Sequence, residues 1–241
     1  MTKVILFDLD GTLLPMETDA FVKDYLKHLA PKVASIIEPE HFLKCLFAGT
    51  EAMMRNVEAE KTNERVFEES FLGLTKLKKE DIWPTLDDFY TNVFPTLSHL
   101  CSPTPLARQV VEEAVKQGYR IAVATNPVFP KAAIYERLRW AGIADMPFEV
   151  VTFYENSCFT KPHVQYYQEI CDRLGVQPSE CLMVGNDKQE DMAASQIGMK
   201  TYLVEGYVID RGEPSYPITE QGTLEEFYES LMKHQGLFEN N

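Results

Sequence analysis

The chain has 241 residues, of which 45% are apolar and 25% are charged, and its formal net charge is −14 at pH 7. This composition is typical of a soluble globular protein that buries a core without disulfides or structural metals. An acidic surface repels nucleic-acid phosphates and anionic lipid headgroups, so neither is expected as a partner. The five cysteines show no metal-binding spacing, and no apolar stretch is long enough for a signal peptide or a membrane span. We therefore expect a cytoplasmic protein.

The first predicted element is a strand over residues 3–7, which read KVILF. A continuous run of β-branched and apolar residues is typical of a strand that is buried on both faces of a parallel sheet. The run ends abruptly at Asp8, and Gly11 supplies a turn residue shortly after it.

Residues 16–100 show no strand-like run, and their apolar residues recur at helical spacing instead. Four helices are expected there, over residues 20–29, 41–57, 66–74 and 82–93. The pattern predicts an all-helical domain at residues 16–100, inserted into a core formed by residues 1–15 and 101–241.

Strand and helix patterns alternate in the rest of the chain. Strands are expected at residues 120–125, 148–152, 181–184 and 200–204, and helices at residues 105–116, 164–174, 190–197 and 224–233. Residues 206–221 are rich in turn formers. Alternation of this kind predicts an α/β core with a Rossmann-like parallel sheet that helices cover on both faces.

Polar residues follow four of the expected strands. They are Asp8 and Asp10 after the first strand, Thr125 and Asn126 after the second, Lys161 after the third, and Asn186, Asp187 and Asp191 after the fourth. Because ligands bind at the carboxyl edge of a parallel sheet, we expect these side chains to form one site.

The residue types at this edge suit phosphoryl transfer. Asp8 and Asp187 offer the hard oxygen ligands that Mg²⁺ prefers, and the ion would neutralise charge so that Asp8 can attack a phosphate. Asp10 can then protonate the leaving oxygen and later activate a water molecule. The expected product of the first step is an aspartyl-phosphate on Asp8.

The remaining polar residues would hold the phosphate and the metal. Thr125 and Asn126 offer a hydroxyl and an amide to phosphoryl oxygens, and Lys161 offers a compact positive charge. Asp191 would hold either a metal-bound water or Lys161.

The motifs FDLDGTL, ATN, KP and GNDKQED, in this order, resemble those of the haloacid dehalogenase superfamily of phosphatases. The resemblance covers essentially the whole core, and the insertion resembles that family's C1-type helical cap. It implies that Asp8 is the nucleophile, Asp10 the acid/base and a metal ligand through its backbone carbonyl, and Thr125 and Lys161 phosphate contacts. It also implies that the cap closes over the site and selects the substrate.

One residue departs from the family's pattern. The fourth motif usually has an acidic residue directly after its glycine, and Asn186 occupies that position. Asp187 can bind the metal if the turn shifts by one residue, and Asn186 could bind it through its amide oxygen. Asp187 is the preferred ligand on the sequence, because a carboxylate binds Mg²⁺ more strongly than a neutral amide.

The sequence thus predicts a magnesium-dependent hydrolase of a small phosphorylated metabolite. A phosphomutase that forms the same intermediate is an alternative, as are a haloacid dehalogenase or phosphonatase relative and a regulator that is phosphorylated on Asp8 without turnover. The second aspartate, Asp10, argues against a dehalogenase. The substrate and the oligomeric state are not encoded in any pattern of this sequence.

Overall fold

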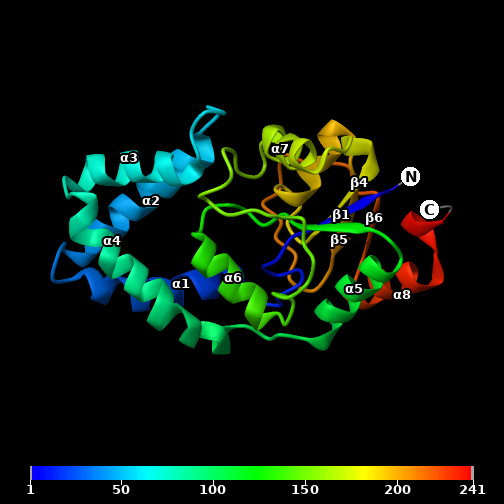
Figure 1. Ribbon diagram of the computed structural model, residues 1–241, viewed down its shortest axis with the longest axis horizontal. Coiled ribbons are helices and arrows are strands. Elements are labelled where there is room, and N and C mark those ends of the chain that lie inside the picture. The colour runs from blue at the N-terminus through cyan, green and yellow to red at the C-terminus, as the bar shows by residue number, and fades with distance from the viewer. Residues whose placement is uncertain (1, 240–241) are drawn as a thin grey trace.

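The fold, described from a computed structural model over residues 2–239, is built on a six-stranded, fully parallel sheet (Figure 1). The strand order is β3-β2-β1-β4-β5-β6. The strands are β1 (Val4–Phe7), β2 (Arg120–Val123), β3 (Val150–Val151), β4 (Cys181–Gly185), β5 (Lys200–Val204) and β6 (Glu220–Gly222). The predicted Rossmann-like α/β core is therefore confirmed.

The central strand β1 ends in register with its two neighbours, β2 and β4. Phe7 lies opposite Val123 of β2 and opposite Val184 of β4. All four residues of β1 are buried, as the continuous apolar run predicted. The segments that follow these three strands therefore start side by side at one edge of the sheet.

Helices cover both faces of the sheet, and the side chains of β1 alternate between them. Ile5 and Phe7 belong to the core cluster that includes Val110 and Phe227, whereas Val4 and Leu6 belong to the cluster that includes Tyr166. The first face is covered by α5 (Pro105–Lys116) and α8 (Leu224–Lys233), and the second by α7 (Val164–Leu174) and the short helix η5 (Asp191–Ile197).

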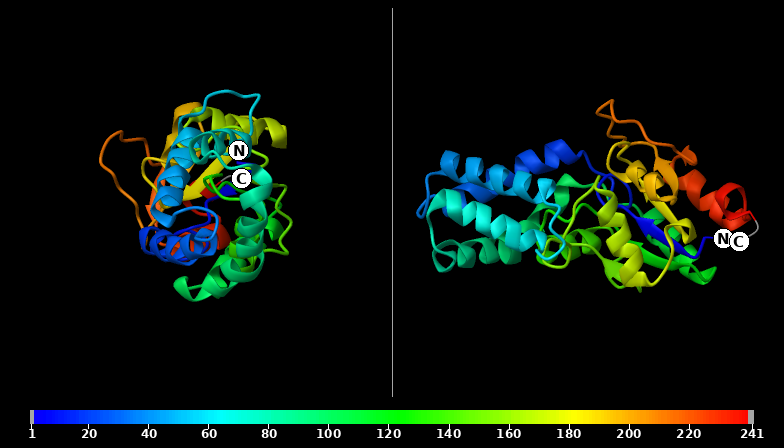
Figure 2. Two further views of the ribbon diagram at one scale, coloured as in Figure 1. Left: turned by 90° about the vertical axis from the view of Figure 1, so that its left-hand side faces the viewer. Right: turned by 90° about the horizontal axis from the view of Figure 1, so that it is seen from above.

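The expected helical insertion forms one end of an elongated molecule, and the sheet forms the other (Figures 1 and 2). Its elements are α1 (Thr18–Leu29), η1 (Ala30–Val33), α2 (Pro39–Arg55), α3 (Asn63–Thr75), α4 (Lys79–Asp88), the π-helical η2 (Phe89–Val93) and the 3₁₀-helical η3 (Phe94–Leu100). Where the chain enters and leaves the insertion, the Ser102 amide donates a hydrogen bond to the Pro15 carbonyl over 2.9 Å.

Among the differences from the prediction, three concern the core sheet and the helices beside it. Helix α6 (Lys131–Trp140) was not predicted, because its buried face includes the polar residue Arg137 and the apolar period is broken. Strand β6 was missed because it is a three-residue polar edge strand. Residues 191–197 form a 3₁₀ helix, since only seven residues precede the Gly198 turn at φ +89°.

Two short 3₁₀ helices complete the described chain, η4 (Pro178–Glu180) and η6 (Gly236–Phe238). Among the helices of residues 2–239, none is long and apolar enough to cross a bilayer.

Candidate active site

Asp8, the first residue after β1, lies in a buried polar cluster. One of its carboxylate oxygens, Oδ1, is 2.8 Å from Nζ of Lys161, and the other, Oδ2, accepts a hydrogen bond from the Thr12 hydroxyl over 3.2 Å. Lys161 is 1% exposed and Asp8 is 7% exposed, so water screens this ion pair poorly. The structure thus brings together the ends of two segments that are 153 residues apart in sequence.

A second carboxylate holds Lys161 from the opposite side of the cluster. Oδ1 of Asp191 lies 2.5 Å from Nζ of Lys161, and Oδ2 accepts the backbone N–H of Asp187 over 2.8 Å. Burial alone would lower the pKa of Lys161, but the charges of Asp191 and Asp8 outweigh burial and hold this pKa well above its usual value. Lys161 is therefore a fixed cation beside Asp8.

Asp10 is paired with Arg137 of α6, a residue for which the sequence gave no functional signal. The Arg137 guanidinium donates a hydrogen bond to Asp10 Oδ2 and lies over the Phe129 ring, 4.5 Å from its centroid. Burial raises the pKa of Asp10, although the charge of Arg137 acts in the opposite direction. Among the described residues, none hydrogen-bonds to Asp10 Oδ1 or Arg137 Nη2, both of which are buried.

Asn186 lies directly against the loop that follows Asp8. Its Oδ1 accepts a hydrogen bond from the Thr12 hydroxyl over 3.0 Å, and its Nδ2 donates to the Tyr207 carbonyl over 2.6 Å. Gly11, at φ +81°, makes this approach possible, because a Cβ there would lie 2.3 Å from Asn186 Nδ2. The amide oxygen thus faces Thr12, which also binds Asp8.

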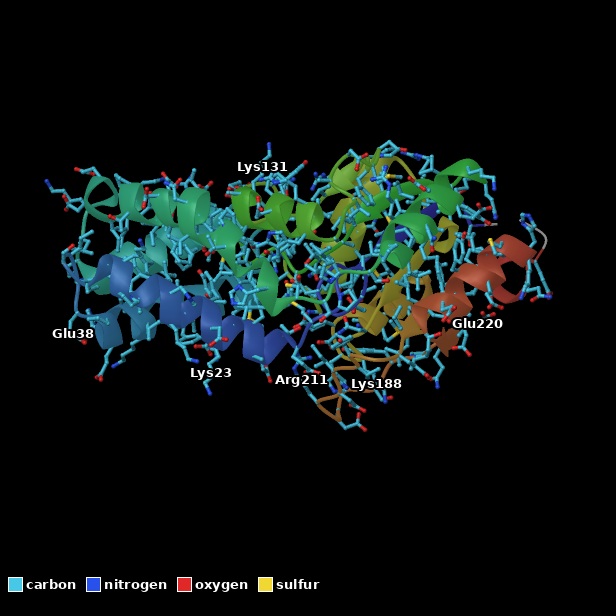
Figure 3. The ribbon with its side chains drawn as sticks, turned by 90° about the horizontal axis from the view of Figure 1, so that it is seen from below. Lys23, Glu38, Lys131, Lys188, Arg211 and Glu220 are labelled. Carbon is cyan, nitrogen blue, oxygen red and sulfur yellow. The ribbon has the colours of Figure 1, made fainter. Side chains whose placement is uncertain are left out.

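Asp187 points its carboxylate into a different set of contacts. Oδ1 accepts the backbone N–H groups of Gln189 and Glu190 over 2.9 and 2.8 Å, and Oδ2 is 2.6 Å from Nη1 of Arg211. Arg211 lies on the loop between β5 and β6, and Figure 3 shows it near the boundary between the sheet domain and the insertion. The side chain of Asp187 therefore caps its own turn and anchors this loop.

The Thr125-Asn126 pair lies where β2 ends. Thr125 is 3% exposed, and its carbonyl accepts hydrogen bonds from the Thr152 hydroxyl and from the Tyr166 hydroxyl. Asn126 accepts the Lys161 backbone N–H over 3.3 Å and donates to Glu190 over 3.0 Å. The structure thus gathers all the residues that the sequence singled out at the carboxyl edge of the sheet.

The oxygen atoms around Asp8 fit a hard divalent cation. In residues 2–239 no three His, Cys, Asp or Glu side chains form a metal-binding group, so such an ion would also need oxygens of other kinds. The Thr12 hydroxyl bonds to both the Asn186 amide oxygen and the Asp8 carboxylate, so these two groups lie close together. The backbone of Asp10 belongs to the same turn as Thr12. Mg²⁺ binds with one or two carboxylates together with neutral oxygens, water and phosphate, which matches this set.

The insertion contacts the loops that carry these residues. Nδ2 of Asn63, a fully buried residue at the start of α3, donates hydrogen bonds to the carbonyls of Pro127 and Phe159 over 3.1 and 3.2 Å. Pro127 directly follows Asn126, and Phe159 lies two residues before Lys161. No sequence pattern indicated that Asn63 joins the insertion to the core, because an asparagine at a helix start is usually only a cap.

A cavity of about 550 Å³ lies between the insertion and the core. One wall is formed by residues 128–130 of the loop after Asn126, together with Tyr154 and Glu155. The opposite walls come from α1, α2, α3, α4 and η2 of the insertion. The cavity adjoins the catalytic cluster through Phe129, which lines it and contacts Arg137.

Comparison with known proteins places these features in a family. The sequence profile of the haloacid dehalogenase-like hydrolases matches residues 5–204. A glyceraldehyde 3-phosphate phosphatase of Methanothermobacter thermautotrophicus is 29% identical over 206 residues, which span 85% of this chain and 86% of that protein.

Solved structures share the fold. A HAD phosphatase from Thermococcus onnurineus superposes with a TM-score of 0.59 at 22% identity, covering 98% of this chain and all of that one. A HAD hydrolase from Bacillus subtilis, solved with bound magnesium, superposes with a TM-score of 0.56 at 19% identity over 95% of this chain and 98% of its own. At this identity the two structures support the fold alone.

Proposed function

Because this chain belongs to the haloacid dehalogenase-like hydrolases, we propose that it is a magnesium-dependent phosphatase that hydrolyses the monoester of a small phosphorylated metabolite. The observation that carries the proposal is the buried cluster in which Lys161 binds Asp8 while Thr12 links Asp8 to Asn186. The cluster contains a carboxylate, a fixed cation and neutral oxygens, and it supports the proposal because phosphoryl transfer is catalysed by positioning and by charge stabilisation.

Asp8 acts as the nucleophile in the proposed reaction. An oxygen of its carboxylate attacks phosphorus and the bond from phosphorus to the ester oxygen breaks, which gives an aspartyl-phosphate and an alcohol. Lys161 holds the Asp8 carboxylate in place and offsets negative charge on the phosphoryl oxygens. Thr125 and Asn126 lie at the adjoining strand end, where a hydroxyl and an amide can hydrogen-bond to the phosphoryl group.

Asp10 moves the protons. Its carboxyl group gives a proton to the leaving ester oxygen and afterwards, as a carboxylate, takes a proton from the water that attacks the aspartyl-phosphate. The raised pKa of Asp10 favours the protonated form that the first step needs. Arg137 fixes the orientation of the Asp10 side chain through its contact with Oδ2.

The residues that would hold Mg²⁺ are Asp8, the Asp10 backbone carbonyl and Asn186. We assign Asn186 in place of the Asp187 that sequence reasoning preferred, because the Asp187 carboxylate is occupied by two backbone N–H groups and Arg211. The Tyr207 carbonyl holds the amide nitrogen of Asn186 and leaves Oδ1 facing the Thr12 side. When bound, the ion neutralises phosphoryl charge and so lets one anion attack another.

Residues 16–100 act as a cap in this proposal, and residues 1–15 and 101–241 form the catalytic core. The hydrogen bonds from Asn63 to the loops before Lys161 and after Asn126 support this division, because they close the insertion over the catalytic residues.

Phosphate release from p-nitrophenyl phosphate tests the proposal. The protein should release phosphate in the presence of Mg²⁺ and lose this activity when EDTA removes the ion. The Asp8→Asn variant keeps the size of the side chain but removes the nucleophile, and its turnover should fall by roughly 10⁴-fold or more. Turnover of that variant at the wild-type rate would refute the proposal, provided that circular dichroism shows both proteins folded.

A further inference from the structure

The cavity between the insertion and the core is lined mainly by apolar side chains, many of which are aromatic. Tyr25, Phe67, Trp83, Tyr90, Phe129 and Tyr154 all contribute to its surface. The rings contact one another, with centroids 5.5 Å apart for Tyr25 and Phe129 and 6.5 Å apart for Phe67 and Tyr154. A volume of about 550 Å³ is in the range of sites that enclose an organic molecule. The cavity therefore has room for far more than a phosphate group.

The charged residues of the cavity all have one sign. Glu64, Asp87 and Glu155 line it, and no Lys, Arg or His is among the described lining residues. The three carboxylates act on the same ring, because each adds to the rise that burial causes in the pKa of Tyr154. An anionic group inside this cavity would therefore meet like charges without a compensating partner.

Nearby basic residues are turned away or already paired. Lys131 is exposed, and Figure 3 shows it at the edge of the molecule. Its Nζ lies over the rings of Tyr135 and Phe153, which do not line the cavity. Lys79 is paired with Glu68 over 2.7 Å, and its Nζ lies 5.2 Å from the centroid of the Trp83 ring. The hydrogen bond to Glu68 raises the pKa of Lys79 most, and the charges of Glu64 and Asp87 add to this rise. The Arg137 guanidinium is bound to Asp10 behind Phe129.

Two of the carboxylates have no direct partner, although the charge of Lys79 acts on both at longer range. The side chains of Glu64 and Asp87 take part in no hydrogen bond or ion pair with the rest of residues 2–239. Glu155 instead accepts the Lys131 backbone N–H over 3.0 and 2.8 Å, so it also caps the start of α6. Aromatic faces together with unpaired carboxylates form the kind of surface that binds ammonium and quaternary ammonium groups.

We propose that this cavity binds the alcohol part of the substrate, and that this part is an apolar group that carries a positive charge. The inference rests on the proposed phosphatase function. The cavity adjoins the proposed site, because the wall formed by residues 128–130 starts two residues after Asn126 and Phe129 contacts Arg137. A preference for a cationic alcohol part would distinguish this protein from phosphatases of small anionic or uncharged esters, such as phosphoglycolate or glyceraldehyde 3-phosphate.

A series of matched esters tests this inference. The cationic esters are trimethylammonio-alkyl phosphates of increasing chain length, starting with phosphocholine, and each has a neutral partner with tert-butyl in place of trimethylammonium. At the best chain length, kcat/KM should be about tenfold higher for the cationic ester, as expected for one desolvated cation–π contact with carboxylate support. Phosphoglycolate and pyrophosphate should be poorer substrates than either.

Variants that remove one negative charge test whether the cavity carboxylates cause the preference for the cationic ester. Glu64→Gln and Asp87→Asn should each lower the ratio of cationic to neutral kcat/KM severalfold. Glu60→Gln is the matched control, since it changes the net charge equally on an exposed residue that does not line the cavity, and it should keep the ratio of the unaltered protein. Equal kcat/KM for both members of every pair, or a preference for the anionic substrates, would overturn the inference.

Binding can be measured without turnover, which separates this inference from the phosphatase proposal. The chain has two tryptophans, so a Trp140→Phe background leaves Trp83 as the reporter in the cavity. Hexyltrimethylammonium ion should change the fluorescence of Trp83 at lower concentrations than neutral hexanol or hexanoate do. This order of binding should also hold in a protein that carries the Asp8→Asn substitution. If this order holds while p-nitrophenyl phosphate is not hydrolysed, only the phosphatase proposal fails. If hydrolysis is normal and the order is absent, only the cavity inference fails.

Discussion

The catalytic cluster and the neighbouring cavity are built on opposite principles. In the cluster each buried charge has a partner of opposite sign, as with Lys161 between Asp8 and Asp191, or Arg137 beside Asp10. In the cavity the charged residues, among those that the structure describes, are all negative, and the walls are apolar and rich in aromatic rings. A cluster in which each charge is held by a partner keeps its geometry whatever the substrate, whereas a cavity whose carboxylates lack direct partners discriminates between substrates.

The two regions also draw on different parts of the chain. The cluster comes from short segments at the ends of parallel strands, which the sheet aligns. The cavity comes from five elements of the insertion together with two loops of the core. Variants in the cluster should therefore affect all substrates alike, and variants at the boundary should affect them unequally.

The largest effect is expected for the metal-binding end of the cluster. Asn186→Ala removes the amide oxygen beside Thr12, and the Mg²⁺ concentration for half-maximal activity should rise by more than about 10²-fold, because even the loss of an outer-shell partner costs roughly 10- to 100-fold in metal affinity. Asp187→Ala should instead cost about 1 kcal/mol of unfolding free energy through the lost cap, and leave the Mg²⁺ requirement near that of the unaltered protein.

Titration of phosphate release with Mg²⁺ and denaturant unfolding measure these two effects. Both variants should act equally on every ester, since neither residue lines the cavity. The opposite result, with a weakened Mg²⁺ response in Asp187→Ala alone, would return the metal site to Asp187.

A smaller effect is expected at Arg137, which lies between the two regions. Arg137→Met leaves Asp10 without its ion partner and removes the group that lies over Phe129. Turnover of alkyl phosphates, which depend on protonation of the leaving oxygen, should fall by roughly 10²-fold. Turnover of p-nitrophenyl phosphate should fall much less, because nitrophenolate leaves without a proton.

The ratio between the two classes of ester is the decisive measurement for Arg137. An equal loss on both esters would show that Arg137 only supports the fold, since the loss of a buried ion pair by itself costs about 3 kcal/mol or more of stability. Arg137→Lys should recover part of the alkyl phosphate activity if the hydrogen bond that orients Asp10 is what matters, since the charge of Arg137 by itself lowers the pKa of Asp10.

Sequence patterns predicted the cluster much better than the cavity, for a physical reason. Asp8, Asp10, Asn126 and Lys161 follow strands, and a parallel sheet brings strand ends together whatever the intervening sequence. The choice between Asn186 and Asp187 was different, because it depends on the Tyr207 carbonyl and on Arg211, both on a loop of no regular pattern. Such contacts between loops leave no periodic signal.

The cavity left still less trace in the sequence. The aromatic residues of the insertion, such as Phe67 and Trp83, recur at helical spacing whether they pack in a core or line a hollow. Arg137 and Asn63 are isolated polar residues on helices, and a sequence alone does not distinguish them from solvent-facing ones. The specificity that we propose for this cavity would therefore depend on tertiary packing, which the motifs do not encode.

The smallest effect, and the most selective, is expected at Asn63. Asn63→Ala removes two hydrogen bonds between the insertion and the core loops, each worth about 1 kcal/mol, and should weaken the contact that holds the insertion against these loops. KM for an ester that fills the cavity should rise by about fivefold to tenfold, whereas p-nitrophenyl phosphate, which fills less of it, should show a smaller change.

Asn92→Ala is the matched control for this change, because the Asn92 side chain is exposed and, within residues 2–239, hydrogen-bonds to Asp88 of the insertion alone. It should leave both KM values near those of the unaltered protein. An equal rise in KM for both esters in Asn63→Ala would show that closure acts on the catalytic cluster as much as on the cavity, and the two regions would then work as one site, because the contacts of Asn63 with Pro127 and Phe159 reach both.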